Sequence, residues 1–204
     1  MSQIALPLAR ARVAAGPGRI VLGEGNAAVV EALKNPRSWP FRAAVLTGPS
    51  RSGKSLLARW FSESGKGDAI DDAQALDEAE LFHRWNRAQE DGRPLLIVGG
   101  VPPWDIALPD LKSRLGAALQ LEIGPPDDAM AAELILSHAE ERGLPLGEDA
   151  AQYLVPRAER SYLQIEKLVE AIDTLSLERK APPTLVIWRA ALEAVQGPEE
   201  PRLL

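Results

Sequence analysis

The chain has 204 residues, of which 46% are hydrophobic and 25% are charged, a balance typical of a soluble globular protein with one core or two small ones. Acidic residues outnumber basic ones by 29 to 23 and give a formal net charge of -6, which argues against sequence-independent binding to DNA. The absence of cysteine excludes disulfides and thiolate metal sites. The sequence also lacks a signal-peptide pattern and any apolar run of the roughly 18 to 20 residues that a membrane span needs, so we expect a cytoplasmic protein with no membrane partner.

The first part of the chain combines an apolar hexad, residues 3–8, with an arginine-rich stretch that contains glycine and proline. Residues 1–19 show neither helical nor strand periodicity, which predicts a flexible arm. The first regular element is expected to be a helix over residues 26–33, with Asn26 as its N-cap.

Predicted strands and helices alternate through the next part of the chain. Short apolar runs predict strands at 43–47, 68–71, 94–98 and 119–123, and helical periodicity between them predicts helices at 54–62, 77–89 and 108–115. Such alternation is typical of a parallel sheet with helices on both faces.

After Gly124 the pattern is helical only. Apolar periodicity predicts helices at 127–142, 147–155, 160–178 and 184–195. We therefore expect an α/β fold followed by a small helical domain, divided into an arm (1–19), a nucleotide-binding base (20–124) and a helical lid (125–204).

The full pattern of a phosphate-binding loop lies between a predicted strand and a predicted helix. Its glycines allow successive backbone N–H groups to face one anion, and the following helix adds the positive end of its dipole. Lys54 would reach the β- and γ-phosphates, and Ser55 would ligate Mg²⁺. The sequence thus predicts ADP or ATP, with Mg²⁺, as cofactor. The residues predicted to hold the nucleotide in this loop are Gly48, Pro49, Ser50, Arg51, Ser52, Gly53, Lys54 and Ser55.

A pair of acids, Asp71 and Asp72, follows the second predicted strand. Carboxylate oxygens near the phosphates would complete a magnesium site, so Asp71 is predicted to hold the metal together with Ser55. Asp72 stands where many such ATPases place a glutamate base, which makes it a candidate catalytic residue. The alternative is a pair of surface acids in a loop, since more acids follow at residues 77–80.

Two arginines lie at helix ends from which they could contact a phosphoryl group. Arg114 is near the end of the helix predicted at 108–115, and Arg160 opens the long helix predicted at 160–178. A guanidinium in either place could spread the charge that develops in phosphoryl transfer. Each arginine, taken alone, is also compatible with an ordinary surface position.

Together and in this order, these motifs resemble those of the AAA+ ATPases of the DnaA branch, and within it the Hda-type regulators of bacterial replication initiation. The resemblance covers residues 20–195 and implies a P-loop AAA+ parallel sheet with an α-helical lid. Leu22 lies in a stretch similar to the one that borders the adenine in this family. Residues 108–114 are similar to the box that holds the arginine finger, which implies that role for Arg114, and Arg160 falls at the lid arginine called sensor 2.

The N-terminal hexad is similar to the short peptide by which Hda-type regulators dock on the sliding clamp of DNA polymerase, its beta subunit. Pro7 favours an extended backbone, and Leu6 and Leu8 could fill an apolar pocket. The amide of Gln3 can donate and accept hydrogen bonds, and Ile4 lies beside it. The alternative is an apolar tail that folds back on its own domain.

Three departures from the family pattern matter. Only residues 196–204 follow the last predicted helix, so we expect no DNA-binding domain and no direct sequence-specific DNA binding. The chain from Lys54 to Asp71 is too short for the family's further strand and helix, which predicts a sheet shortened by one edge strand. Gly99-Gly100 stands where the family has a polar residue, called sensor 1, that orients the attacking water, so intrinsic hydrolysis is expected to be weak.

The expected function is that of an adaptor. It would bind the clamp, present Arg114 to the ATP of a DnaA partner and so promote its hydrolysis, which regulates initiation negatively. The alternatives are an autonomous ATPase of the helicase-loader type, active in its own homo-oligomer, and a nucleotide-free scaffold. ATP turnover by the isolated protein distinguishes the autonomous ATPase from the adaptor. Nucleotide analysis of the purified protein distinguishes the nucleotide-free scaffold from the adaptor.

Overall fold

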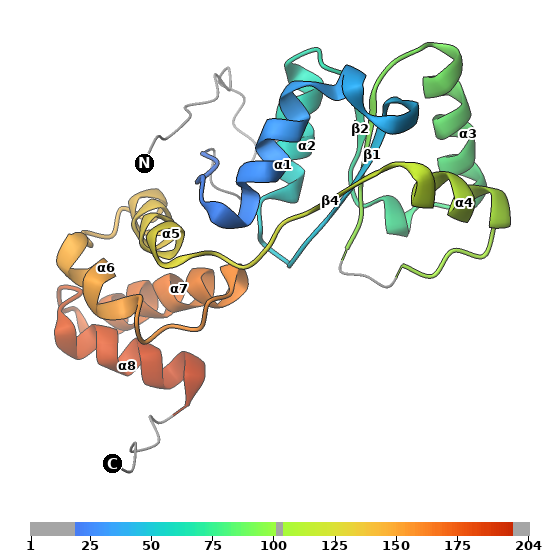
Figure 1. Cartoon of the computed structure of the whole chain (residues 1–204). Helices are drawn as coiled ribbons and strands as arrows, with labels where there is room; N and C mark the ends of the chain where they lie inside the picture. The colour runs from blue at the N-terminus through green and yellow to red at the C-terminus, as the bar shows by residue number, and fades with distance from the viewer. Residues whose placement is uncertain (1–18, 101–103, 198–204) are drawn as a thin grey trace, which may run out of the picture. The chain divides into compact units, whose positions relative to one another are not determined.

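The computed structural model describes residues 19–100 and 104–197, which form two compact units (Figure 1). The base unit comprises the described residues from Glu24 to Gly124. The lid unit comprises residues 125–197 together with the segment 19–23. Residues 20–23, which the sequence placed with the base, therefore group with the lid. The predicted clamp peptide, residues 3–8, lies outside the described residues.

The base unit contains a parallel sheet in the order β2-β3-β1-β4, which confirms the predicted fold class. Its central strand β1 pairs with β3 in the register Leu46↔Val98 and with β4 in the register Leu46↔Leu121. Strand β2 pairs with β3 and forms one edge of the sheet. The strands are β1 (Ala43–Thr47), β2 (Asp68–Ile70), β3 (Leu95–Val98) and β4 (Leu119–Glu122).

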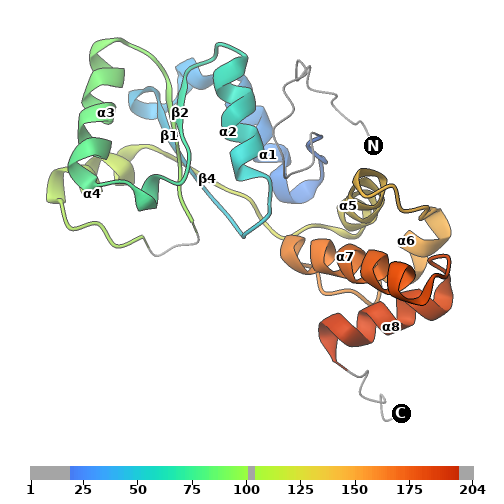
Figure 2. The ribbon, with the colours of Figure 1, turned by 180° about the vertical axis from the view of Figure 1, so that it is seen from behind.

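Helices cover both faces of this sheet, α1 and α2 on one side and α3 and α4 on the other (Figures 1 and 2). On the α3–α4 face, Trp85 and Leu111 pack in one buried cluster with Val45 and Ile97 of the strands. On the α2 side, Phe61 is fully buried and its ring stacks on Trp39 at 5.4 Å between centroids. The helices are α1 (Glu24–Lys34), α2 (Lys54–Glu63), α3 (Glu78–Glu90) and α4 (Pro109–Ala117), with 3-10 turns at Pro36–Ser38, Pro40–Arg42 and Ala73–Ala75.

Helix α1 begins earlier than the sequence predicted. It starts at Glu24, whose negative charge suits the positive end of the helix dipole. Asn26 is consequently inside the helix and is only 2% exposed, so the prediction that it caps the helix is wrong.

The lid unit consists of four helices with a shared core. Helix α7 packs on α5 and α8, and α6 packs on α5 and α8. Tyr162, at the start of α7, is buried and its hydroxyl donates to Met130 Sδ at 3.6 Å, and this burial raises the pKa of Tyr162 to about 12. The helices are α5 (Asp128–Glu141), α6 (Glu148–Leu154), α7 (Tyr162–Arg179) and α8 (Leu185–Gln196).

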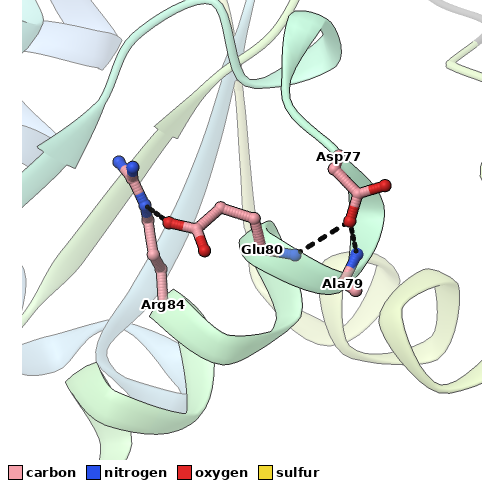
Figure 3. Close-up of polar contacts among 4 residues, drawn as sticks. All are labelled: Asp77, Ala79, Glu80 and Arg84. Atoms are coloured by element: carbon pink, nitrogen blue, oxygen red, sulfur yellow. Dashed lines mark hydrogen bonds and ion pairs between the residues drawn. The ribbon is translucent and has the colours of Figure 1, made fainter.

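Helix α3 has a capped N-terminus that can be tested by mutation (Figure 3). Asp77 Oδ1 accepts hydrogen bonds from the backbone N–H groups of Ala79 at 2.9 Å and Glu80 at 3.3 Å. Asp77→Ala leaves these donors without that partner and should lower the free energy of unfolding by about 1 kcal/mol, measured by chemical denaturation. Glu80→Ala is the control, because its exposed ion pair with Arg84 contributes less, about 0.3–0.5 kcal/mol. An equal loss in both variants would contradict the capping role.

Among residues 19–100 and 104–197, no helix is long and apolar enough to cross a membrane.

Candidate functional site

The phosphate loop joins the central strand β1 to helix α2, so it lies at the carboxyl edge of the sheet, where ligands bind in open parallel sheets. Gly48 has φ +152°, and a Cβ there would come within 2.9 Å of Ile123 Cβ, just after β4. Gly53 has φ +86° and immediately precedes α2. Glycine is required at these positions because a side chain would be strained at both and would also collide at Gly48.

Lys54, the first residue of α2, folds back over the loop. Its ammonium Nζ donates to the carbonyl oxygens of Gly48 at 2.8 Å and Pro49 at 2.7 Å. Burial lowers the pKa of Lys54, and the negative charge of Asp71 opposes this shift. The fold therefore brings Lys54 and Asp71 within electrostatic range of each other, as a nucleotide site with Mg²⁺ requires.

The other loop side chains differ in exposure. The hydroxyl of Ser52 is buried and has no hydrogen-bond partner among the described residues, whereas Ser50, Arg51 and Ser55 are exposed. A buried donor left unpaired is costly, and a phosphate oxygen is a suitable acceptor for it. The loop residues therefore fit a nucleotide phosphate group.

The two acids lie directly after edge strand β2, beside β3. Both are exposed, and Asp71 Oδ1 accepts a hydrogen bond from the backbone N–H of Asp72 at 3.0 Å. Asp72 adopts the left-handed conformation, with φ 49°, and this turns the chain into the 3-10 turn Ala73–Ala75. No group of three or more acidic or histidine side chains gathers as a metal site in the part of the chain that the structure describes. A metal held here would take its remaining ligands from the phosphates and water.

A polar side chain that the sequence analysis missed lies beside the end of β3. The backbone N–H of Gly100 donates to Gln74 Oε1, a contact between residues 26 positions apart. Gly99 N–H donates to the carbonyl of Leu46 at 2.9 Å, which holds this segment next to β1. The only signal in the sequence is that Gln74 follows Asp72 by two positions. The sequence does not show where the side chain of Gln74 points.

Arg114 lies in the last turn of α4 and is half-buried against α3. Its Nη1 donates to Asn86 Oδ1, and its guanidinium lies 4.5 Å from the centre of the Phe82 ring. The start of α4 is also fixed by α3, since the carboxylate of Glu78 accepts hydrogen bonds from the N–H groups of Ala107 at 2.9 Å and Leu108 at 2.7 Å. The geometry therefore fixes Arg114 on the α3–α4 face of the base, and its action on a partner's phosphate stays a prediction.

Two predicted nucleotide contacts, Leu22 and Arg160, belong to the lid unit. Arg160 forms an ion pair with Asp128 at 2.7 Å, and both side chains are more than half exposed, at 61% and 62%. Exposed ion pairs contribute little to stability, so breaking this pair to free the guanidinium of Arg160 for another contact costs little free energy. The roles of Leu22 and Arg160 toward a nucleotide stay predictions.

Comparison with known proteins agrees with this architecture. Residues 128–185, which include most of the lid, match the family described as Hda, lid domain. Domain III of the replication initiation protein DnaA from Thermotoga maritima superposes with a TM-score of 0.68 over 87% of this chain and 95% of that chain, at 16% identity. The chain thus shares the fold of a DnaA AAA+ domain, and part of its helical lid is similar to the Hda lid family.

Other known proteins share the fold or part of the sequence. AMPPCP-bound DnaA from Aquifex aeolicus has a TM-score of 0.57, with 20% identity over 78% of this chain and 66% of that one. The RuvB Holliday junction branch migration motor of Thermotoga maritima has a TM-score of 0.60, with 18% identity over 88% of this chain and 73% of that one. DnaA of Thermus thermophilus is 29% identical over 139 residues, which are 64% of this chain. The chain thus spans about a third, 32%, of the length of the curated initiator that it matches.

Proposed function

We propose that this protein is an Hda-type adaptor that negatively regulates replication initiation. It binds the sliding clamp of DNA polymerase and promotes hydrolysis of the ATP bound to DnaA. The observation that carries the proposal is a lid of the Hda family joined to a base whose phosphate loop is complete. The similarity to DnaA in sequence and in fold supports DnaA as the partner.

The protein's own nucleotide, ADP or ATP with Mg²⁺, binds at the phosphate loop. Lys54 contacts the phosphates, and Ser55 and Asp71 hold the metal. The family resemblance also implies nucleotide contacts from Leu22 and Arg160. Support comes from the fit of the loop and from the related DnaA of Aquifex aeolicus, which binds AMPPCP.

The action on DnaA is assigned to Arg114. A planar guanidinium inserted at a partner's γ-phosphate stabilises the charge that develops on its oxygens during hydrolysis. Asp72, exposed directly after edge strand β2, would position the attacking water at the protein's own site. Because Asp72 is one carbon shorter than the glutamate usual in such sites, turnover by the protein alone is slow.

The likeness to the RuvB motor favours a second candidate function, an autonomous ATPase that works in its own oligomer. The two functions differ in a single measurement. Turnover by the isolated protein within the range of about 1–10³ per second typical of enzymes would support the autonomous ATPase and contradict the adaptor.

The adaptor function is tested by following hydrolysis of ATP prebound to DnaA, with and without this protein and clamp-loaded DNA. We expect faster hydrolysis only when this protein and the clamp are both present. Hydrolysis at the unstimulated rate when both are present would refute the proposal. Purified protein that contains no bound nucleotide would support the nucleotide-free scaffold instead.

The N-terminal hexad is predicted to make the contact with the clamp. Leu6→Ala combined with Leu8→Ala removes two apolar anchors, each worth about 1.5–3 kcal/mol when buried, and should abolish co-elution of the two proteins. Ala5→Ser is the control, since it leaves the anchors in place. A double variant that still co-elutes with the clamp, or that melts at a much lower temperature than the parent, would favour a tail packed on its own domain.

A further inference from the structure

The end of β3 poses a chemical problem for the proposed nucleotide site. Gly99 and Gly100 have no side chains, so this edge of the site would contain no polar group that can contact the γ-phosphate. A site that distinguishes ATP from ADP needs a donor near the third phosphate, because the first two are alike in both nucleotides. The structure places a polar side chain from a different segment beside the end of β3.

This polar group is the side-chain amide of Gln74, in the 3-10 turn Ala73–Ala75 that follows the two acids. Its Oε1 accepts a hydrogen bond from the Gly100 N–H, and a backbone N–H can only donate, so the amide orientation is fixed. The two hydrogens of Nε2 remain, and within the described residues they have no acceptor. The amide is therefore anchored by its oxygen and has two donors available.

The glycines at the end of β3 make room for this amide. A Cβ on Gly100 would lie 2.5 Å from Gln74 Oε1 and 2.7 Å from Nε2, closer than real Cβ contacts come. The lack of a side chain at Gly100 thus leaves space at the end of β3, and the amide of Gln74, from the turn after β2, occupies this space. A larger residue at position 100 would displace the amide.

The location of this arrangement connects it to the phosphate loop. Strands β1 and β3 pair in register, so Gly99 lies beside Thr47, and a Cβ on Gly99 would be 3.9 Å from Thr47 Cγ2. Thr47 directly precedes Gly48, the first residue of the loop. Gln74 therefore lies at the carboxyl edge of the sheet, beside the end of β3, which is the strand next to the one that carries the loop.

We propose that the Gln74 amide is the γ-phosphate contact of this site, so that Gln74 makes the protein distinguish ATP from ADP. The inference rests on the proposed nucleotide site. Nε2 donates to an oxygen of the γ-phosphate while Oε1 stays on Gly100, and the anchored amide needs no reorganisation when the triphosphate arrives. A hydrogen bond to a charged oxygen is stronger than one between neutral groups, so its loss is measurable.

The test compares the affinities of the purified protein for ADP and for a non-hydrolysable ATP analogue. Gln74→Ala should weaken binding of the analogue about tenfold and leave binding of ADP within about twofold. Gln74→Glu is the sharper variant, because its carboxylate can still accept from the Gly100 N–H but offers no donor and repels the γ-phosphate. It should weaken analogue binding more than Gln74→Ala does.

The matched control is Gln89→Ala. Gln89 also makes one side-chain bond to the backbone of the base unit, from Nε2 to the carbonyl of Phe41 at 2.8 Å, but Phe41 precedes β1 at the opposite edge of the sheet. This variant should leave both affinities unchanged. An unaltered ratio of the two affinities in both Gln74 variants overturns the inference alone. A parent protein that binds neither nucleotide overturns the proposed nucleotide site and the inference with it.

Discussion

Arg114→Ala should remove most of the stimulated hydrolysis of DnaA-bound ATP, a loss of about 10³-fold or more if Arg114 is the finger. The change takes away a planar group that stabilises charge on the γ-phosphoryl oxygens, and alanine offers no substitute. Arg114→Lys should restore little, since a point charge does not reproduce the fork of N–H donors. The measurement is DnaA-bound ATP remaining over time in the presence of clamp-loaded DNA.

The contacts of Arg114 in the base unit define what this experiment must control. Its guanidinium lies over Phe82 and donates to Asn86, so reaching a partner's phosphate breaks contacts worth about 1–2 kcal/mol in total. Arg114→Ala also loses these contacts, and its melting temperature and nucleotide binding should be compared with those of the parent. Arg84→Ala, an exposed arginine of α3 paired with Glu80, removes the same charge and should keep full stimulation. If Arg114→Ala still stimulates DnaA like the parent, the inactivation must depend on another residue.

Lys54→Ala should weaken the binding of ADP and ATP alike by at least about tenfold, equivalent to 1.4 kcal/mol. The ammonium is held at the phosphate loop by the carbonyls of Gly48 and Pro49, a position from which it can turn toward the phosphates. Isothermal titration with each nucleotide measures the loss. Lys54 is predicted to reach the β-phosphate, which ADP and ATP share, so its replacement should weaken the binding of both nucleotides, whereas Gln74→Ala is expected to weaken only the binding of the triphosphate.

Lys66→Ala is the matched control for this prediction. Lys66 also donates from Nζ to a backbone carbonyl of the base unit, that of Lys34, at 3.1 Å, but it follows α2 and is away from the loop. Its replacement should leave nucleotide affinity unchanged. Equal affinities for parent and Lys54→Ala would show that the loop does not bind nucleotide through its lysine.

The sequence by itself determined the local elements of this protein. The apolar runs predicted β1 and β3, and the glycine-rich loop before Lys54 predicted the start of α2 at the residue where the structure has it. These features depend on neighbours within a few positions, since strand and helix periodicity and the backbone freedom of glycine are local properties. The alternation of strands and helices was also sufficient to predict the parallel sheet, which the structure confirms.

Tertiary structure alone decided which distant residues meet. Asn26 is an ordinary helix cap by residue type, but the chain begins its helix at Glu24 and buries Asn26. Gln74 meets Gly100 across 26 positions, and Arg114 meets Asn86 across 28. These pairings are set by the order of the strands and by the packing of α3 against α4, which single-chain periodicity does not encode. The sequence shows only that Gly99 and Gly100 have no side chain at the end of β3. The tertiary structure shows that the amide of Gln74, from the turn after β2, lies beside them.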